Sequence, residues 1–344
     1  MSLDTLPTEL QLQIVAQLSK VSNINALSQV NRSYYNLLVN HLYTVDELTL
    51  QKDALRWALT HQNGGTLQRW REAGLDINRM RRNNTRPLIE AMKAGSDWAT
   101  WQILHLGANI HIADNQGRTP LHLACADDFQ RPDLVRYMLA QGANSSATTR
   151  AKETPLFMAI RCGNAEIVEA LLENGADHAA KDRMGCAPLH EVIENGRVEI
   201  AQLLLQHGAN PSLPRPLTGE TPLHTAILTG SLDMIKLLVD SGADLAAEYN
   251  DFTPLLLACQ DGSVDVVRWM LQNGVDVQSN TNKRGLTPLH AAAMGGSDEV
   301  VRILLQHQAP DMLTVPDQYG DTPVTVASRY KHDSLARMMV QLVN

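Results

Sequence analysis

The stretch Thr287-Pro288-Leu289-His290 decides the fold, because close copies of it recur along the chain. Identical tetrapeptides stand at 119–122 and 221–224, and weaker copies begin at 154, 187, 253 and 322. From Pro120 to Pro323 the successive prolines are 35, 33, 34, 32, 34 and 35 residues apart. A fixed period in this range indicates an array of stacked structural repeats.

The unit from 154 to 182 predicts the structure of one repeat. Thr154 is a good N-cap, and Pro155 suits the first helical position because its missing N–H would be unpaired there. We expect a helix over 156–161, a break at 162–164 and a second helix over 165–173 with its apolar residues on one face. Gly175 ends this helix in a left-handed conformation. Each unit is therefore a helix, a turn, a helix and a projecting loop, and it needs neighbours to bury its apolar stripe.

A small residue stands four positions after each proline, where a second helix must approach closely. The residues at this position are Ala124, Ala159, Val192, Ala226, Ala258, Ala292 and Ala327. Helix propensity alone would not place alanine at one phase of the cycle, so we interpret these positions as helix-to-helix contacts.

These features resemble the ankyrin repeat: the Thr-Pro-Leu-His element, the period near 33 and a Gly-Ala-Asp or Gly-Ala-Asn turn. The turn occurs at 107–109, 142–144, 175–177, 208–210 and 242–244. The resemblance implies an all-α ankyrin-repeat solenoid of about nine helix-turn-helix repeats with projecting β-hairpin loops. The array occupies 46–344, with repeats that start near 48, 81, 114, 149, 182, 216, 248, 282 and 317.

Residues 1–45 do not fit the repeat and predict a small unit of three helices. The pattern Leu6-Pro7-x-Glu9-Leu10, followed by 14, 18 and 27–32, resembles an F-box, as in fungal-type proteins where an F-box precedes ankyrin repeats. This resemblance implies docking to the small adaptor of SCF-type ubiquitin ligases. The expected adaptor-binding residues are Leu6, Pro7, Glu9, Leu10, Ile14, Leu18, Leu27 and Val30. The alternative is a helical cap that only shields the first repeat.

Composition limits the function further. The formal net charge of −8 argues against general binding to nucleic acid. No apolar run is long enough to span a bilayer, and we interpret the four cysteines as reduced thiols. We therefore expect a monomeric cytoplasmic or nuclear protein that binds no membrane.

Two local features remain open between a structural and a functional interpretation. The proline-rich stretch 211–216 predicts a stiff, projecting loop, which is either neutral drift or a contact or modification site. Trp98 and Trp101 either pack on a neighbouring repeat, cover the F-box-like unit or form a contact patch.

In ankyrin proteins, partners usually bind along the concave surface formed by the loop tips and first helices. Carried over by phase, this partner groove comprises Arg82, Lys93, Arg150, Arg161, Arg183, Tyr249, Phe252, Lys283, Arg284, Tyr319, Arg329 and Tyr330. The nearby Lys152, Lys181 and Arg215 add to its basic character. We expect a protein partner with acidic side chains toward the amino-terminal half and apolar ones near Tyr249, Phe252 and Tyr319. The alternative is that arginines simply populate solvated loops.

The motif histidines invite a metal or catalytic interpretation. His122, His190, His224 and His290 lie on different repeats without ligand spacing, so we expect them to bond backbone and threonine instead. We expect no catalytic residue, no metal and no cofactor.

The sequence favours a non-catalytic protein–protein interaction module, the substrate receptor of an SCF-type E3 ubiquitin ligase. The second hypothesis is an ankyrin scaffold or inhibitor whose N-terminal helices only cap. A remote third is an enzyme or small-molecule binder that uses the concave groove.

Overall fold

The computed structural model describes residues 76–78, 86–126, 131–278, 281–307 and 310–343. They fall into two compact units, 1–149 and 150–344, and each unit is described by itself. The expected F-box-like unit (1–45) and most of the first expected repeat (near 48) lie outside the described residues.

The described residues form eight helix pairs. In the first unit they are α6 (Pro87–Lys93) with α7 (Asp97–His105), and α8 (Pro120–Cys125) with α9 (Pro132–Ala140). In the second unit they are α10 (Pro155–Cys162) with α11 (Ala165–Glu173), α12 (Pro188–Glu194) with α13 (Val198–Gln206), α14 (Pro222–Leu228) with α15 (Leu232–Asp240), α16 (Pro254–Asp261) with α17 (Val264–Gln272), α18 (Pro288–Gly295) with α19 (Asp298–Gln306), and α20 (Pro323–Arg329) with α21 (Asp333–Val343). A short 3-10 helix, η2 (Pro310–Thr314), precedes α20.

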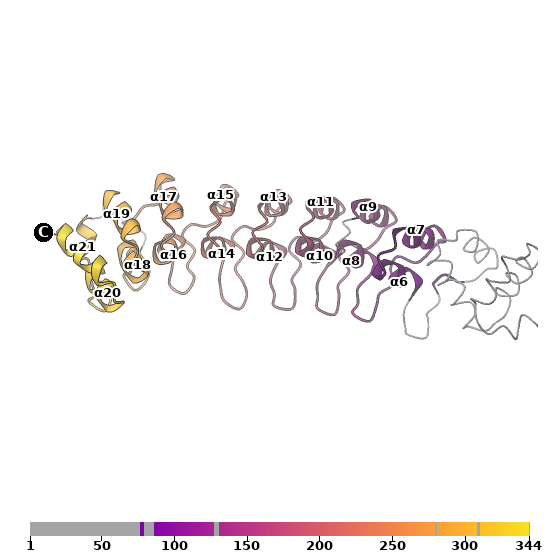
Figure 1. The fold of residues 1–344 in the computed structure, drawn as a ribbon, viewed down its shortest axis with the longest axis horizontal. Coiled ribbons are helices and arrows are strands. Elements are labelled where there is room, and N and C mark those ends of the chain that lie inside the picture. Colours follow the sequence, from indigo (N-terminus) through magenta and orange to yellow (C-terminus); the bar gives the residue numbers. More distant parts are fainter. Residues whose placement is uncertain (1–75, 79–85, 127–130, 279–280, 308–309, 344) are drawn as a thin grey trace, which may run out of the picture. The chain divides into compact units, whose positions relative to one another are not determined.

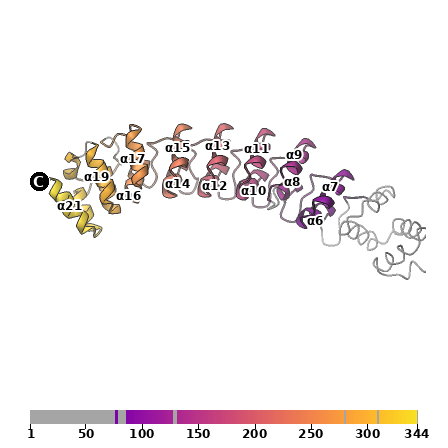
Figure 2. The same ribbon diagram turned by 45° about the horizontal axis from the view of Figure 1, so that its top comes forward.

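Within the second unit the first helix of each pair packs against the first helix of the next pair. Figures 1 and 2 show two rows there: α10, α12, α14 and α16 form one, and α11, α13, α15 and α17 form the other. The loops that precede the first helices project away from the second row (Figure 1). The expected helix-turn-helix array is confirmed for the described residues.

Each first helix begins with proline at its first position, as the sequence predicts. Thr119, Thr253, Thr287 and Thr322 each accept a hydrogen bond from a backbone N–H of the first turn. Thr154 occupies the same N-cap position without such a bond. Threonine alone therefore does not guarantee the cap.

The unit around α10 and α11 follows its predicted boundaries. Asn164 caps α11 by accepting the N–H of Ile167 at 3.0 Å, and Gly163 ends α10 with φ 74°. Ile167, Val168 and Leu171 are buried along one face of α11. Burying such side chains contributes about 1.5–3 kcal/mol each.

The small residues of the first helices are buried, as close helix packing requires. Ala159, Ala226, Ala258 and Ala292 are fully buried, and so is the exception Val192. At α18 the approach is closer still, because a Cβ added to Gly295 would lie 2.0 Å from the backbone oxygen of Gln260 in α16. Only glycine fits at that position.

The prediction of β-hairpins in the projecting loops is wrong for the described residues. These loops, here called fingers, cover 114–118, 150–153, 182–186, 215–220, 249–252, 282–286 and 317–321. Their one β-bridge joins Tyr249 and Phe252, and no longer strand pairing occurs in the described part of the chain. A finger such as 182–186 is closed by two backbone hydrogen bonds. The N–H of Asp182 donates to the carbonyl of Cys186, and the N–H of Gly185 donates to the carbonyl of Asp182. It is too short for a strand ladder.

Trp101 packs on the neighbouring repeat, which confirms that interpretation for this residue. Its ring stands edge-on to Tyr137 of α9, with 5.0 Å between the ring centroids. None of the described helices is long and apolar enough to cross a bilayer.

Candidate functional site

Polar side chains inside the fingers hold them in shape. In the 182–186 finger, one carboxylate oxygen of Asp182 accepts the N–H groups of Met184 and Cys186, each at 2.8 Å. Asp114, Asn282 and Asp317 close their own fingers in the same way. These four fingers are therefore preformed displays of the side chains at their tips.

Three motif histidines, His190, His224 and His290, tie their first helices to the loop region of the next repeat. His290 Nδ1 accepts the backbone N–H of Thr287 at 3.2 Å, so the proton lies on Nε2, which donates to the backbone oxygen of Asp321 at 2.9 Å. His190 reaches Leu213 and His224 reaches Phe252 in the same way. The prediction that these imidazoles bond backbone and threonine is confirmed for His224 and His290. His190 bonds backbone alone, because Ala187 stands where the others have threonine.

These three imidazoles are neutral because they are buried. Burial lowers the pKa of His190, His224 and His290 below the ordinary value of 6.5. Their Nε2–H donors remain committed to backbone carbonyls, so the rings hold the array together and leave no free nitrogen for other chemistry.

In the first unit, the groove residue Lys93 pairs with Asp114 at 2.7 Å, and Arg118 pairs with the same carboxylate at 2.9 Å. Burial raises the pKa of Asp114, but the hydrogen bonds from Lys93 and Arg118 outweigh it and hold that pKa well below its ordinary value. The two cations line a cavity of about 220 Å³ together with Arg86. The cavity wall therefore combines three cations and Asp114 with the apolar residues Ile89 and Ala113.

Arg161, at the end of α10, lies between two carboxylates. Its guanidinium bonds Glu191 of α12 at 2.9 Å and Glu153 of its own finger at 2.8 Å. The hydrogen bond to Glu191 raises the pKa of Arg161 above its ordinary value. Its charge therefore joins two neighbouring repeats and is balanced locally.

Four other predicted groove residues gather at two adjoining fingers. Lys283 pairs with Glu248 at 2.9 Å, and Arg284 pairs with Asp251 at 2.5 Å. Tyr249 and Phe252 exchange both backbone bonds and are half-buried, with the Tyr249 ring 5.5 Å from that of His224. These aromatic rings are partly used by the array itself.

The last fingers bring together another part of the predicted groove. Tyr319 is 69% exposed at the tip of its finger, and Tyr330 is 49% exposed at the end of α20. Arg329 pairs with Asp321. The backbone N–H of Gln318 donates to the carbonyl of Arg284, so the 282–286 and 317–321 fingers are joined.

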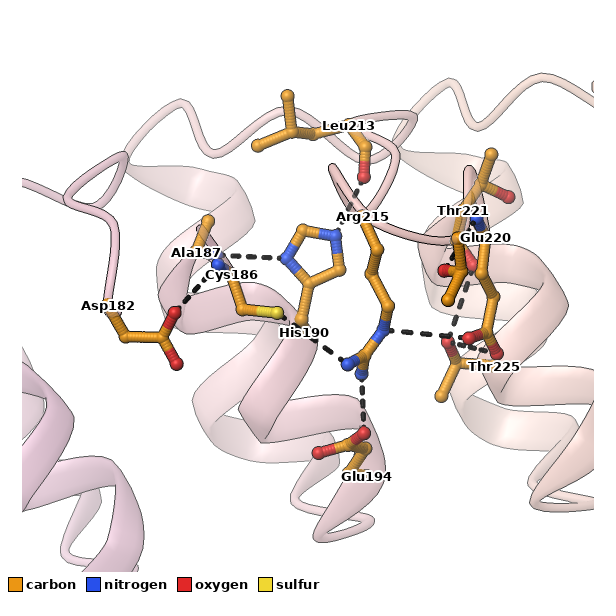
Figure 3. Close-up of polar contacts among 11 residues, drawn as sticks. Asp182, Cys186, Ala187, His190, Glu194, Leu213, Arg215, Glu220, Thr221 and Thr225 are labelled. Atoms are coloured by element: carbon orange, nitrogen blue, oxygen red, sulfur yellow. Dashed lines mark hydrogen bonds and ion pairs between the residues drawn. The ribbon is translucent and has the colours of Figure 1, made fainter. Parts of the chain in front are cut away.

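Arg215 takes the place of the finger-closing aspartate in the 215–220 finger (Figure 3). The turn of this finger is one residue longer than that of the 182–186 finger. Its guanidinium turns inward and bonds Glu194 of α12 at 2.6 Å, with Glu220 at 3.7 Å and Cys186 Sγ also at 3.7 Å. Burial raises the pKa of the Cys186 thiol. Arg215 is thus an internal clamp between repeats.

Sequence reasoning missed two exposed apolar finger tips of the second unit. Met184 is 61% exposed and stands directly before Gly185, and Leu217 is 77% exposed and stands two positions before Gly219. Proximity to the glycine that turns each finger would have identified both tips. The expected groove residue Arg82 and the eight expected adaptor-binding residues (Leu6, Pro7, Glu9, Leu10, Ile14, Leu18, Leu27 and Val30) lie outside the described residues.

Comparison with known proteins gives consistent matches. The family model "Ankyrin repeats (3 copies)" matches residues 88–182, 129–215, 189–281 and 278–343, which together span about three quarters of the chain. Among solved structures, the ankyrin repeat domain of Bcl-3, described as a unique member of the IkappaB protein family, is similar with a TM-score of 0.57 and 30% identity over 64% of this chain and 98% of that chain. The human ASB11 ankyrin repeat domain is similar with a TM-score of 0.55, 28% identity and the same coverages.

Two curated relatives match a shorter segment. Protein phosphatase 1 regulatory subunit 27 of Homo sapiens is 40% identical over 68 residues, and its Mus musculus counterpart is 42% identical over 68 residues. These segments cover 20% of this chain and 43% of each relative, so the match spans less than half of the relatives' length.

Proposed function

This chain belongs to the ankyrin-repeat family, and we propose that it is the substrate receptor of an SCF-type E3 ubiquitin ligase. The family indicates a protein–protein interaction module. In the proposal, residues 1–45 dock the ligase adaptor, and the fingers and first helices hold the protein to be modified. The receptor does no chemistry itself, because it works by raising the effective concentration of substrate near the ligase.

One observation carries this proposal: an F-box-like pattern is followed in the same chain by an ankyrin-repeat array with projecting fingers. The pattern runs from Leu6 to Tyr43, directly before the repeats. The array beyond it holds its fingers in shape through Asp182 and its equivalents, which leaves the tips available for a partner. We place the protein in the cytoplasm or nucleus, where SCF-type ligases act.

A pull-down with the purified adaptor tests the proposal. A variant with Leu6→Ala, Pro7→Ala and Ile14→Ala should lose adaptor binding by at least about tenfold, since buried anchor residues dominate such interfaces. Leu342→Ala, which changes an apolar side chain 51% exposed on α21, is the matched control and should bind the adaptor normally. Adaptor binding that survives the triple substitution, with helical content and melting unchanged, contradicts the proposal.

The second candidate is an ankyrin scaffold or inhibitor whose N-terminal helices only cap the array. The relatives favour it, because both are named as regulatory subunits of a phosphatase and are thus non-catalytic. Deletion of residues 2–45 distinguishes the two functions. A chain that becomes insoluble without losing any ligase partner supports the scaffold.

A further inference from the structure

Three neighbouring fingers of the second unit join into one surface. Arg183 donates from Nη2 to the backbone oxygen of Arg150 at 2.9 Å, which links the 182–186 finger to the 150–153 finger. On its other side, Gly185 touches the next finger, since a Cβ added there would lie 2.8 Å from Cγ of Pro216. The three fingers are therefore in contact along their sides.

The first two of these fingers carry cations that no carboxylate of the described residues neutralises. Arg150, Lys152, Lys181 and Arg183 are all exposed, and none of them forms an ion pair within the described part of the second unit. The nearby carboxylates are engaged elsewhere. Glu153 bonds Arg161, Asp182 closes its own finger, and Glu220 pairs with Arg215 and accepts the hydroxyl of Thr225.

Apolar side chains stand beside these cations. Met184 and Leu217 occupy the tips of adjoining fingers and are among the most exposed large apolar residues of the described chain. The extra residue of the 215–220 finger lengthens the turn that carries Leu217. A flexible thioether adapts to varied apolar partners.

We propose that Arg150, Lys152, Lys181, Arg183, Met184 and Leu217, the tip surface, bind an acidic protein segment that carries an apolar side chain. The segment's carboxylates face the four cations, and its apolar side chain packs on Met184 and Leu217. Charge complementarity selects this partner, because the tip surface is positive on a chain of net charge −8. The proposal rests on the proposed function in that it names the class of substrate segment that the array would hold.

The chemistry of the tip surface favours a protein over a nucleic acid. Binding of single strands relies on aromatic side chains on which bases stack. The three fingers contain no tryptophan, tyrosine or phenylalanine, whereas both exposed tips are aliphatic. Binding of a single-stranded polynucleotide that survives the Leu217→Ser substitution would overturn the proposal.

Selection from a random peptide library displayed on phage, with the full chain as bait, tests the tip surface. Selected peptides should place aspartate and glutamate around one apolar residue. A fluorescein-labelled selected peptide should bind about tenfold more weakly, by fluorescence anisotropy, to Leu217→Ser and to the double variant Arg150→Glu/Lys181→Glu. Its binding should also weaken as salt rises, because exposed charges are screened.

Matched controls change similar side chains elsewhere. Leu342→Ser removes an exposed apolar side chain on α21, and Arg302→Glu reverses an exposed cation on α19. Both should bind the peptide as the unchanged protein does. Failure to enrich acidic peptides, or equal losses in the controls, would overturn the proposal.

The adaptor pull-down separates this proposal from the proposed function. The tip variants should bind the adaptor normally. If the adaptor docks but the tip variants bind the acidic peptide as tightly as the unchanged protein does, only the tip-surface proposal is refuted. Acidic peptides that bind the tips of a chain that does not dock the adaptor would refute the receptor role alone.

Discussion

The first helices α10 and α18 differ in the residue that stands three positions after the N-cap threonine. In α18, the His290 ring accepts the backbone N–H of Thr287 at the helix start and donates to the carbonyl of Asp321 in the next finger. In α10, Phe157 stands at the equivalent position, 1% exposed, and the Thr154 hydroxyl is buried without a hydrogen-bond partner. His290 therefore adds polar bonds between α18 and the next finger, whereas Phe157 of α10 fills the equivalent space as a buried apolar ring. The comparison shows that the repeat tolerates loss of its histidine where a large apolar ring fills the space.

The close approach at the end of α18 gives the largest expected effect. Gly295→Ala should lower the free energy of unfolding by at least about 3 kcal/mol, because its Cβ would lie 2.0 Å from the Gln260 oxygen. Gly175→Ala is the matched control: nothing lies within 4 Å of the added Cβ, and only the positive φ of 75° opposes it. That control should lose about 1 kcal/mol. Urea unfolding measures both, and equal losses would contradict the tight helix contact.

Exchanging the two ring types tests the comparison directly. His290→Phe should lower the free energy of unfolding by about 1–3 kcal/mol, since the Thr287 N–H loses its acceptor inside the protein. The reverse change, Phe157→His, should alter stability by less than about 1 kcal/mol, because a new bond to Thr154 offsets the lost apolar surface. Thermal and urea unfolding of both variants measure this difference. Two equally destabilised variants would show that the histidine bridge contributes nothing special.

The pH dependence of stability should follow the buried imidazoles. Their pKa values are lowered in the folded protein, so below about pH 6.5 the unfolded chain binds more protons than the folded one. The stability present above pH 6.5 is therefore lost as pH falls, by at most about 1.4 kcal/mol per pH unit for each group. His290→Phe should lose less stability than the unchanged protein between about pH 7.5 and about pH 5.5. An identical slope for both would contradict the assignment of His290 as neutral and buried.

The smallest effect concerns the ion pair that α10 makes with α12. Glu191→Gln should lower the free energy of unfolding by only about 0.2–1 kcal/mol, because Arg161 is 49% exposed and keeps its bond to Glu153. High salt should reduce this difference further. A loss above about 2 kcal/mol would show that surface charge, and not the apolar seam, dominates the contact between these repeats.

Local signals explain why so much of the fold follows from the sequence. The proline at each first helical position, the alanines four residues later and the turn glycine Gly175 act through their immediate neighbours, so their phase predicts helix starts, close contacts and helix ends. The finger conformation was mispredicted because a closing turn of four to six residues, such as 182–186, leaves no room for paired strands.

The charges at the candidate site could not be predicted as well. Arg161 meets Glu191, 30 positions away in the sequence, only because stacking brings one repeat over the next. Arg215 stands where the preceding finger carries Asp182, and it turns inward because Glu194 and Glu220 lie within reach. Whether a cation is free to face a partner or pairs with an internal carboxylate therefore depends on which residues of the neighbouring repeat the stacking brings next to it. The sequence identifies the four cations as basic positions, but that they form no ion pair, and that Met184 and Leu217 are exposed tips beside them, emerges only from the three-dimensional arrangement.

We expect residues 1–45 and the repeat array to bind different partners. Affinity purification of three versions of the full chain, with mass spectrometry of the bound proteins, tests this expectation most directly. The Leu6→Ala/Pro7→Ala version should lose the ligase adaptor and keep the proteins held by the array. The Leu217→Ser version with Arg150→Glu and Lys181→Glu should keep the adaptor and lose proteins with acidic segments. If both versions recover the same proteins as the unchanged chain, the receptor account is contradicted.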